Sequence, residues 1–168
     1  HSPEAKKDLK EETAARENIT YVEQTEALGT AHALKAALPH VTTDNLLVLL
    51  GDVPLLSQPT INKLQEETQN NDLVVLTGTV SDPSGYGRIN KDDSGKPRAI
   101  IEELDCNDEQ RKIKEIISGI MAFKTNVARN LVDKIKPNPK KNEYYLTDAI
   151  EIAYHEGLET MSYSASEA

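Results

Sequence analysis

The sequence predicts a three-layer α/β/α domain built on a mixed sheet. Strand-like and helix-like segments alternate along the first half of the chain, and shorter, hairpin-like segments follow from about residue 85. Residues 46–50 are apolar at every position, which is typical of a strand covered by helices on both faces of a parallel sheet. These observations place the core in a central sheet.

Five helices are predicted from apolar stripes of helical period, bounded by capping residues and by prolines or glycines. The first begins at Ser2-Pro3-Glu4, where a hydroxyl, a proline and an acid stand in the order typical of a helix start. The predicted helices cover residues 2–16, 31–38 and 57–68, and run from Thr125 to Pro137 and from Thr147 to Gly157.

Strands are predicted between these helices from short apolar and β-branched runs. The last of them is interrupted at Ser118-Gly119, where a glycine favours an irregularity in the strand. The predicted strands cover residues 19–22, 46–50, 73–80, 88–90, 99–101 and 113–123.

The composition argues against some classes of binding partner and indicates the cellular compartment of the protein. The net charge of -9 and the pI near 5.0 disfavour binding to nucleic acid, because the phosphate backbone would be repelled. The most basic stretch, residues 134–141, contains prolines and asparagines and is interpreted as a solvated loop. No apolar run reaches the length of a membrane span. The single cysteine, Cys106, agrees with a reducing compartment, so a cytoplasmic location is expected.

Asp52 is the first candidate for a functional residue, as a ligand of a metal ion. It follows the apolar run 46–50 and Gly51, a residue that lets a ligand approach the backbone. Ligands of open α/β sheets bind beyond the carboxyl ends of the strands. A lone carboxylate there suits Mg²⁺ held jointly with substrate phosphates. The alternative is that Asp52 only caps a turn before Pro54.

The segment that precedes the helix 31–38 is a second candidate. Gly29 permits close backbone approach, and the Thr30 hydroxyl with the helix-start N–H groups could contact a uracil edge or a phosphate. A plain helix cap explains the same pair equally well. His32, on the helix itself, is interpreted as a packed or surface histidine rather than as a ligand.

Three further segments could contact a sugar, each with a simpler structural reading. The turn Gly85-Tyr86-Gly87 could present backbone amides to a flat ligand, or be an ordinary turn. Glu102 or Glu103 could accept hydrogen bonds from sugar hydroxyls, and the other would then be solvated charge. Residues 144–148 offer aromatic surface beside a helix start, or only core packing and capping.

The order of these pieces is more specific than any one of them. Together they resemble the uridyltransferase domain of the bacterial bifunctional N-acetylglucosamine-1-phosphate uridyltransferase/glucosamine-1-phosphate acetyltransferase, over nearly the whole chain from about Ile19. The motifs that carry the resemblance are Gln24 with Leu28-Gly29-Thr30-Ala31-His32-Ala33, Gly51-Asp52-Val53-Pro54-Leu55, Asp82-Pro83-Ser84-Gly85-Tyr86-Gly87-Arg88-Ile89, Ile100-Ile101-Glu102, Ser118-Gly119-Ile120 and Glu143-Tyr144-Tyr145-Leu146-Thr147-Asp148.

The resemblance implies a nucleotide-diphospho-sugar transferase-like, Rossmann-like fold with a mostly parallel mixed sheet. It also implies a reaction of UTP with N-acetylglucosamine 1-phosphate, with Mg²⁺ as cofactor. Gln24 would contact uracil together with Gly29 and Thr30, and Asp52 would be the catalytic metal ligand. The residues implied as sugar- and phosphate-side contacts, with the glycine beside the metal ligand, are Gly51, Gly87, Glu102, Tyr145 and Thr147.

The chain also departs from that family. Residues 1–168 are expected to be a partial uridyltransferase domain that lacks the glycine-rich loop with its lysine, the second, asparagine metal ligand and the β-helical acetyltransferase domain. Ile117 stands where the family has a sugar-contacting asparagine. The parent enzyme is expected to be a homotrimer and the fragment an inactive monomer. The alternatives are a non-catalytic nucleotide-sugar-binding remnant and, much less favoured, a receiver domain phosphorylated at Asp52.

Overall fold

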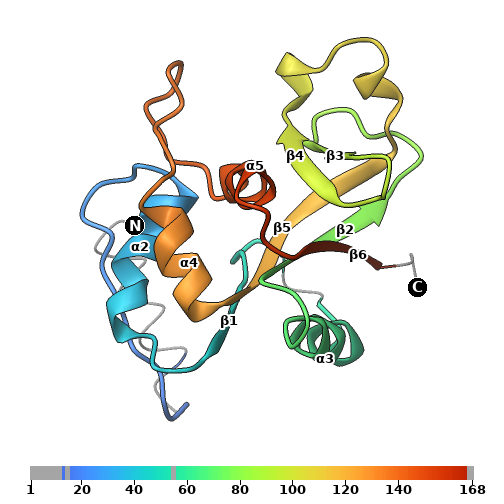
Figure 1. The fold of residues 1–168 in the computed structure, drawn as a ribbon. Coiled ribbons are helices and arrows are strands. Elements are labelled where there is room, and N and C mark those ends of the chain that lie inside the picture. Colours follow the sequence, from blue (N-terminus) through green and yellow to red (C-terminus); the bar gives the residue numbers. More distant parts are fainter. Residues whose placement is uncertain (1–12, 14–15, 54–55, 166–168) are drawn as a thin grey trace.

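The computed structural model describes residues 13, 16–53 and 56–165. This part of the chain forms one six-stranded sheet in the order β4-β3-β5-β2-β6, with β1 also paired to β5 (Figure 1). The strands are β1 (Asn45–Val48), β2 (Leu73–Thr79), β3 (Arg88–Lys91), β4 (Pro97–Ile101), β5 (Glu115–Lys124) and β6 (Thr160–Ala165).

The sheet is mixed, as predicted, but the expectation that it is mostly parallel is wrong for the described residues. Only β2 and β6 pair in parallel. The long central strand β5 runs antiparallel to β1, β2 and β3, and β3 runs antiparallel to β4. The two strands expected to lie in a parallel core, β1 and β2, do point the same way, but β5 lies between them and reverses the pairing.

Helices cover both faces of this sheet, which confirms the three layers. The helices α2, α4 and α5 lie on one side and α3 on the other (Figure 1). Their bounds are α2 (Thr30–Ala37), α3 (Gln58–Glu67), α4 (Thr125–Val132) and α5 (Asp148–His155), with short 3₁₀ turns at Leu38–His40, Glu103–Asp105 and Gln110–Lys112.

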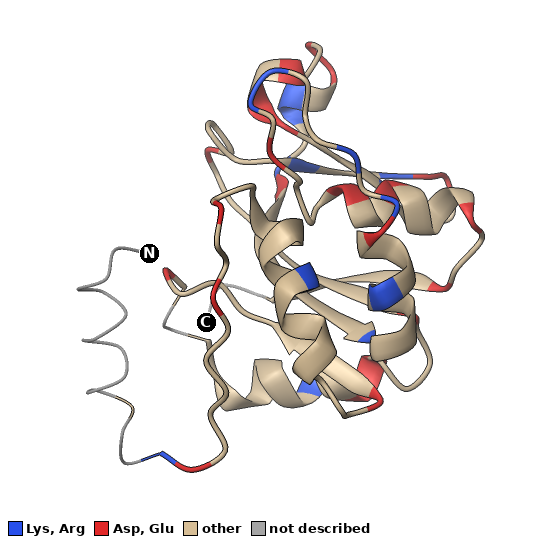
Figure 2. Ribbon diagram, turned by 90° about the vertical axis from the view of Figure 1, so that its left-hand side faces the viewer, with Lys and Arg blue, Asp and Glu red and all other residues tan. Residues whose placement is uncertain are grey.

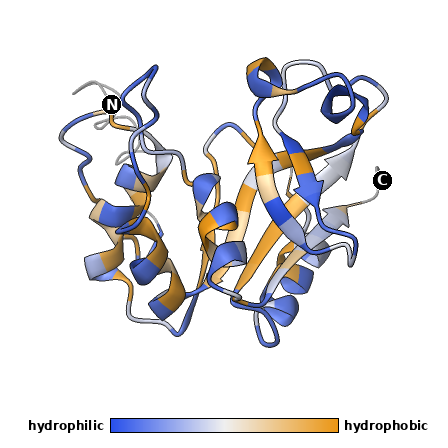
Figure 3. Ribbon diagram, turned by 45° about the horizontal axis from the view of Figure 1, so that its top comes forward, coloured by the Kyte–Doolittle hydropathy of each residue, from blue (hydrophilic) through white to orange (hydrophobic). Residues whose placement is uncertain are grey.

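Alternate residues of the central strands face the two helical layers. In β2, Leu73 and Val75 pack with α2, α4 and α5, whereas Val74 packs against Leu64 of α3. The same alternation holds in β5, so both strands are apolar along most of their length. Figure 3 shows the apolar residues concentrated in the strands and on the inward sides of the helices.

Several sequence expectations are corrected. Residues 19–22 form no strand, and Ile19 and Tyr21 are each 40% exposed. A short β-branched run becomes a strand only where a neighbouring strand pairs with it, and within the described residues this run has none. The strand β6 was not predicted, and the first predicted helix lies almost entirely outside the described residues.

The predicted helix caps have mixed outcomes. Ser57, with which the predicted helix 57–68 begins, is the N-cap of α3, because its Oγ accepts a hydrogen bond from the Thr60 N–H at 3.3 Å. Thr125 is instead the first residue of α4, which Lys124 precedes without a side-chain capping bond. Thr147 does hold the N-cap position of α5, but its side chain makes no capping bond either.

Candidate functional site

Two of the segments that the sequence predicted to form the site, the turn after β1 and the start of β3, lie along one edge of β5. Along this edge β1 pairs with the carboxyl end of β5, as far as Met121, and β3 pairs with its other end at Ile116. Between the two lies the irregularity at Ser118-Gly119, where Ser118 Oγ donates to the Leu76 carbonyl at 2.7 Å. The end of β1 and the start of β3 therefore flank the same short stretch of β5.

The turn after β1 carries Asp52 beside this stretch. Val53 N–H donates to the Leu50 carbonyl at 3.3 Å, and a Cβ on Gly119 would lie only 2.3 Å from Leu50 Cδ1. Gly119 has a φ of +81°, so the backbone conformation favours glycine there, and a Cβ would also displace the Leu50 side chain. Asp52 and Gly51 are exposed at the end of the strand.

The loop before α2 holds Gln24 in a defined position. The Gln24 Nε2 donates to the Gly29 carbonyl at 3.0 Å and lies 3.0 Å from His32 Nδ1. The Gly29 carbonyl also accepts the first hydrogen bond of α2, from the Ala33 N–H at 3.1 Å. These two contacts hold the Gln24 side chain against the amino end of α2.

The same loop is joined to residues 144–146. Tyr144 N–H donates to the Leu28 carbonyl at 2.7 Å, and Ala31 N–H donates to the Tyr144 carbonyl at 2.9 Å. The Thr30 hydroxyl accepts a hydrogen bond from Leu146 N–H at 2.9 Å. The loop and helix start that contain the predicted nucleotide contacts Gln24, Gly29 and Thr30 are therefore hydrogen-bonded to the segment that carries Tyr145 and Thr147.

A second group lies at the start of β3 and the end of β4. A Cβ on Gly87 would lie 2.8 Å from Ile100 Cγ2, 3.3 Å from Ile117 Cγ2 and 3.5 Å from Glu102 Oε1. The Gly87 carbonyl accepts a hydrogen bond from Ile117 N–H at 3.1 Å. A Cβ at residue 87 would displace the Ile100 side chain, and Glu102 and Ile117 both border this glycine.

The two adjacent glutamates have different roles. Glu103 accepts hydrogen bonds from Arg88 Nη2 at 2.6 Å, Arg111 Nη1 at 2.7 Å and Gly85 N–H at 3.3 Å. It is the structural member of the pair. Figure 2 shows that basic and acidic residues both occur in the loops at the top of the molecule. Glu102 is exposed and faces Gly87, so it is the one available to a ligand.

Asp148 is a residue that the sequence reasoning quoted only as the end of a motif. Burial, the nearby Glu151 and then Glu102 raise the pKa of its carboxyl above the usual range. Glu102 follows β4 and Asp148 begins α5, and these two elements are in contact. Burial, followed by a hydrogen bond to the Glu143 carboxylate, likewise raises the pKa of the Tyr145 phenol.

Asp52 is the remaining predicted site residue. Within the described residues no hydrogen bond or ion pair joins it to Gln24, Thr30 or Glu102. No cluster of three or more His, Cys, Asp or Glu side chains in that part of the chain could enclose a metal ion. A cation at Asp52 would therefore draw most of its ligands from substrate and water.

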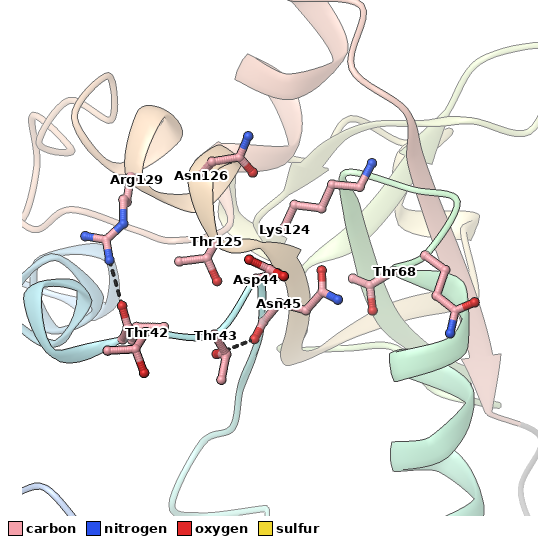
Figure 4. Close-up of a pocket in the computed structure, with 11 residues that line it drawn as sticks. Thr42, Thr43, Asp44, Asn45, Thr68, Lys124, Thr125, Asn126 and Arg129 are labelled. Atoms are coloured by element: carbon pink, nitrogen blue, oxygen red, sulfur yellow. Dashed lines mark hydrogen bonds between the residues drawn. The ribbon is translucent and has the colours of Figure 1, made fainter.

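A separate cavity of about 610 Å³ opens at the other end of β1, where Asp44 precedes the strand and Asn45 begins it (Figure 4). Lys124 Nζ on its wall pairs with Asp72 at 2.9 Å, and Arg129 Nη2 donates to the Val41 carbonyl at 2.9 Å. Asp52 follows the opposite end of the same strand, so this cavity is not the predicted site. None of its lining residues was a predicted site residue.

The described helices include none long and apolar enough to cross a lipid bilayer. Their apolar residues instead pack against the sheet.

Among curated proteins, the chain is 42% identical over 151 residues to the bifunctional protein GlmU of Pseudomonas putida, covering 90% of the chain and 33% of that protein. It is 44% identical over 147 residues to the bifunctional protein GlmU of Francisella tularensis subsp. novicida, covering 88% of the chain and 32% of that protein. The chain thus spans about a third of the length of these relatives.

Solved structures share the fold at low identity. A glucose-1-phosphate thymidylyltransferase, named as putative, from Bacillus anthracis in complex with a sucrose has a TM-score of 0.72 and 22% identity, covering 95% of this chain and 63% of that one. A UDP-glucose pyrophosphorylase complexed with UDP-glucose has a TM-score of 0.69 and 18% identity, covering 98% and 65%. The family model described as nucleotidyl transferase matches residues 1–168. By this match over its whole length, the chain belongs to the nucleotidyl transferase family.

Proposed function

We propose that the protein containing this chain transfers a uridylyl group from UTP to N-acetylglucosamine 1-phosphate, releasing pyrophosphate and forming UDP-N-acetylglucosamine. The observation that carries the proposal is the pairing of the loop before α2 with residues 144–146. This pairing supports one continuous wall with nucleotide contacts at one end and sugar contacts at the other. The identity of 42–44% to GlmU proteins over most of the chain supports the choice of substrates.

The reaction needs positioning and charge neutralisation more than acid–base chemistry. A phosphate oxygen of the sugar phosphate attacks the α-phosphorus of UTP. The bond from that phosphorus to the oxygen bridging to the β-phosphate breaks in line, and pyrophosphate departs with the electron pair. Because the attacking phosphate is already ionised at neutral pH, no side chain has to accept a proton.

The proposed roles follow from the two groups of residues. Gln24, Gly29 and Thr30 hold the uracil edge against the amino end of α2. On the sugar side, Gly87 and Gly51 allow the substrate to approach the backbone. Glu102, Tyr145 and Thr147 border the sugar and its phosphate from the ends of β4 and the start of α5.

The proposed cofactor is Mg²⁺, with Asp52 as its protein ligand. An exposed single carboxylate at a strand end fits a cation that keeps several waters and shares substrate phosphates. Bound in that way, Mg²⁺ would neutralise charge on the phosphate oxygens. A cytoplasmic location stays a prediction from the single cysteine, and a homotrimeric parent protein stays a prediction from the resemblance.

The test is a chimera in which this chain replaces the matching segment of the full-length Pseudomonas putida relative. We expect the purified chimera to release pyrophosphate from UTP and N-acetylglucosamine 1-phosphate in the presence of Mg²⁺. Circular dichroism and the unmodified relative are the controls for folding and assay. A folded chimera that binds UDP-N-acetylglucosamine without turnover would favour the binding-module alternative.

The metal role has its own variant. Asp52→Asn in the chimera should lower turnover by about 100-fold or more and leave the melting temperature unchanged, because the side chain is exposed. The matched control is Asp93→Asn, an exposed carboxylate in the turn between β3 and β4. Equal turnover of the two variants would exclude Asp52 as the metal ligand.

A further inference from the structure

The amide of Gln24 has only one chemically acceptable orientation. The atom that faces the Gly29 carbonyl at 3.0 Å must be Nε2, because a carbonyl oxygen can only accept a hydrogen bond. The same Nε2 lies 3.0 Å from His32 Nδ1. With one N–H directed to each partner, both protons of the amide are used.

This arrangement defines the state of His32. A nitrogen that accepts from Nε2 cannot itself carry a proton, so His32 is neutral and carries its proton on the other ring nitrogen. The Tyr144 ring, whose centroid is 6.5 Å from that of His32, lies on the segment paired with the same loop. His32 and Gln24 are both half-buried, which limits competition from water.

We infer that His32 is a positioning residue that sets base specificity through Gln24. With Nε2 tied to Gly29 and His32, the amide oxygen of Gln24 is left as its recognition atom, and in the described part of the chain it has no other partner. That oxygen accepts the N3–H of uracil or thymine. Cytosine presents an unprotonated N3 there, which places two acceptors against each other. This inference rests on the proposed function, since it requires that Gln24 contact the base.

The first test reads the tautomer directly and needs no turnover. Long-range ¹H–¹⁵N spectra of the chain, with the His32 signals assigned by their loss in His32→Asn, should show a neutral ring protonated at Nε2. A ring protonated at Nδ1 would overturn the inference, whatever the enzymatic activity.

The second test separates positioning from mere packing. In the chimera, His32→Leu removes the acceptor, whereas His32→Asn places an oxygen where Nδ1 stood. We expect His32→Leu to raise KM for UTP about tenfold with little change in kcat, and to lower the preference for UTP over CTP by about tenfold. His32→Asn should stay within about threefold of the unmodified chimera on both measures.

A control variant and two opposing results distinguish a positioning role of His32 from simple packing. His40→Leu, at an exposed histidine just beyond α2, should leave KM and the UTP/CTP preference unchanged. Equal losses with UTP and CTP, or no rescue by asparagine, would mean that His32 only packs, and would reject the inference. Absence of turnover in the unmodified chimera would instead reject the proposed function, and the tautomer measurement would still test the geometry.

Discussion

The carboxylate of Glu103 lies 2.6 Å from Nη2 of Arg88, whose side chain is only 2% exposed. The same carboxylate accepts from Arg111 at 2.7 Å. Arg88 begins β3 and follows Gly87, and Arg111 belongs to the 3₁₀ turn that precedes β5. One glutamate therefore joins the start of β3 to the turn before β5. The geometry of the sugar side therefore depends on a residue that is not proposed to contact the sugar.

Glu103→Gln should destabilise the protein more than any exposed charge substitution. It leaves the Arg88 charge buried without a matching carboxylate, which is far more costly than losing a surface ion pair. We expect the melting temperature to fall by about 6–12 °C, measured by circular dichroism. Glu102→Gln, at the exposed neighbour, is the control and should shift it by about 2 °C or less. Similar shifts for both would contradict the structural role of Glu103.

Acidification should remove the same contribution. The hydrogen bond from Arg88 is the main cause that holds the pKa of Glu103 below its usual range, against a smaller opposing effect of burial. A depressed folded-state pKa gives a contribution that is complete above the unfolded-state pKa, about 4.3, and is lost as the pH falls through the folded-state pKa. The difference in melting temperature between the unmodified protein and Glu103→Gln should thus be constant from pH 7 to 5 and shrink below about pH 4. A difference that widens on acidification would be inconsistent with this pair.

The sequence was informative where a residue's role depends on its immediate neighbours. The apolar run at 46–50 predicted β1 with helices on both sides, although the strand ends at Val48 and Leu49 is 51% exposed. Gly119 predicted the irregularity in β5. Strand direction was not predictable, because the antiparallel insertion of β5 depends on the long-range pairing of β1 and β2 with it. The run at 19–22 had strand-forming residues and no described neighbour to pair with.

The candidate site likewise contains residues that the sequence predicted and contacts that it could not predict. The order of the motifs identified Gln24, Gly29 and Thr30 as candidates, and the structure places all three at the amino end of α2. Which of Glu102 and Glu103 is structural could not be decided from sequence, since it depends on two arginines 15 and 8 residues away. The partnership of His32 with Gln24 was missed, because an eight-residue separation gave no sign that the loop folds back onto α2.

Gly29→Ala should disrupt the wall shared by the loop and residues 144–146. Gly29 has a φ of +97°, and a Cβ there would lie 2.6 Å from the Tyr144 carbonyl oxygen, so the backbone segments would have to separate. We expect a loss of about 2–4 kcal/mol in the free energy of unfolding, measured with urea. The control is Gly78→Ala in β2, where nothing lies within 4 Å of a Cβ, and its change should be about 0.5 kcal/mol or less. If the two alanine variants unfolded at the same urea concentration, the close approach at Gly29 would be refuted.

Ile117→Asn should improve turnover of N-acetylglucosamine 1-phosphate in the chimera. Ile117 faces Gly87 and Glu102, and the resemblance places a sugar-contacting asparagine at this position. The backbone N–H of residue 117 donates a hydrogen bond to the Gly87 carbonyl at 3.1 Å. Because this bond does not involve the side chain, the strand pairing should survive the substitution. One added hydrogen bond to the sugar should raise kcat/KM about tenfold, measured by pyrophosphate release.

The same substitution should also lower the unfolding free energy by about 1–3 kcal/mol, because the isoleucine packs against the core shared with α2, α4 and α5. Ile117→Leu is the matched control, since it keeps an apolar side chain and should leave kcat/KM within about twofold. A gain in turnover that appears only with asparagine, despite the lost stability, can come only from a polar contact to the substrate. Unchanged or reduced turnover with asparagine would show that the sugar does not reach this part of β5.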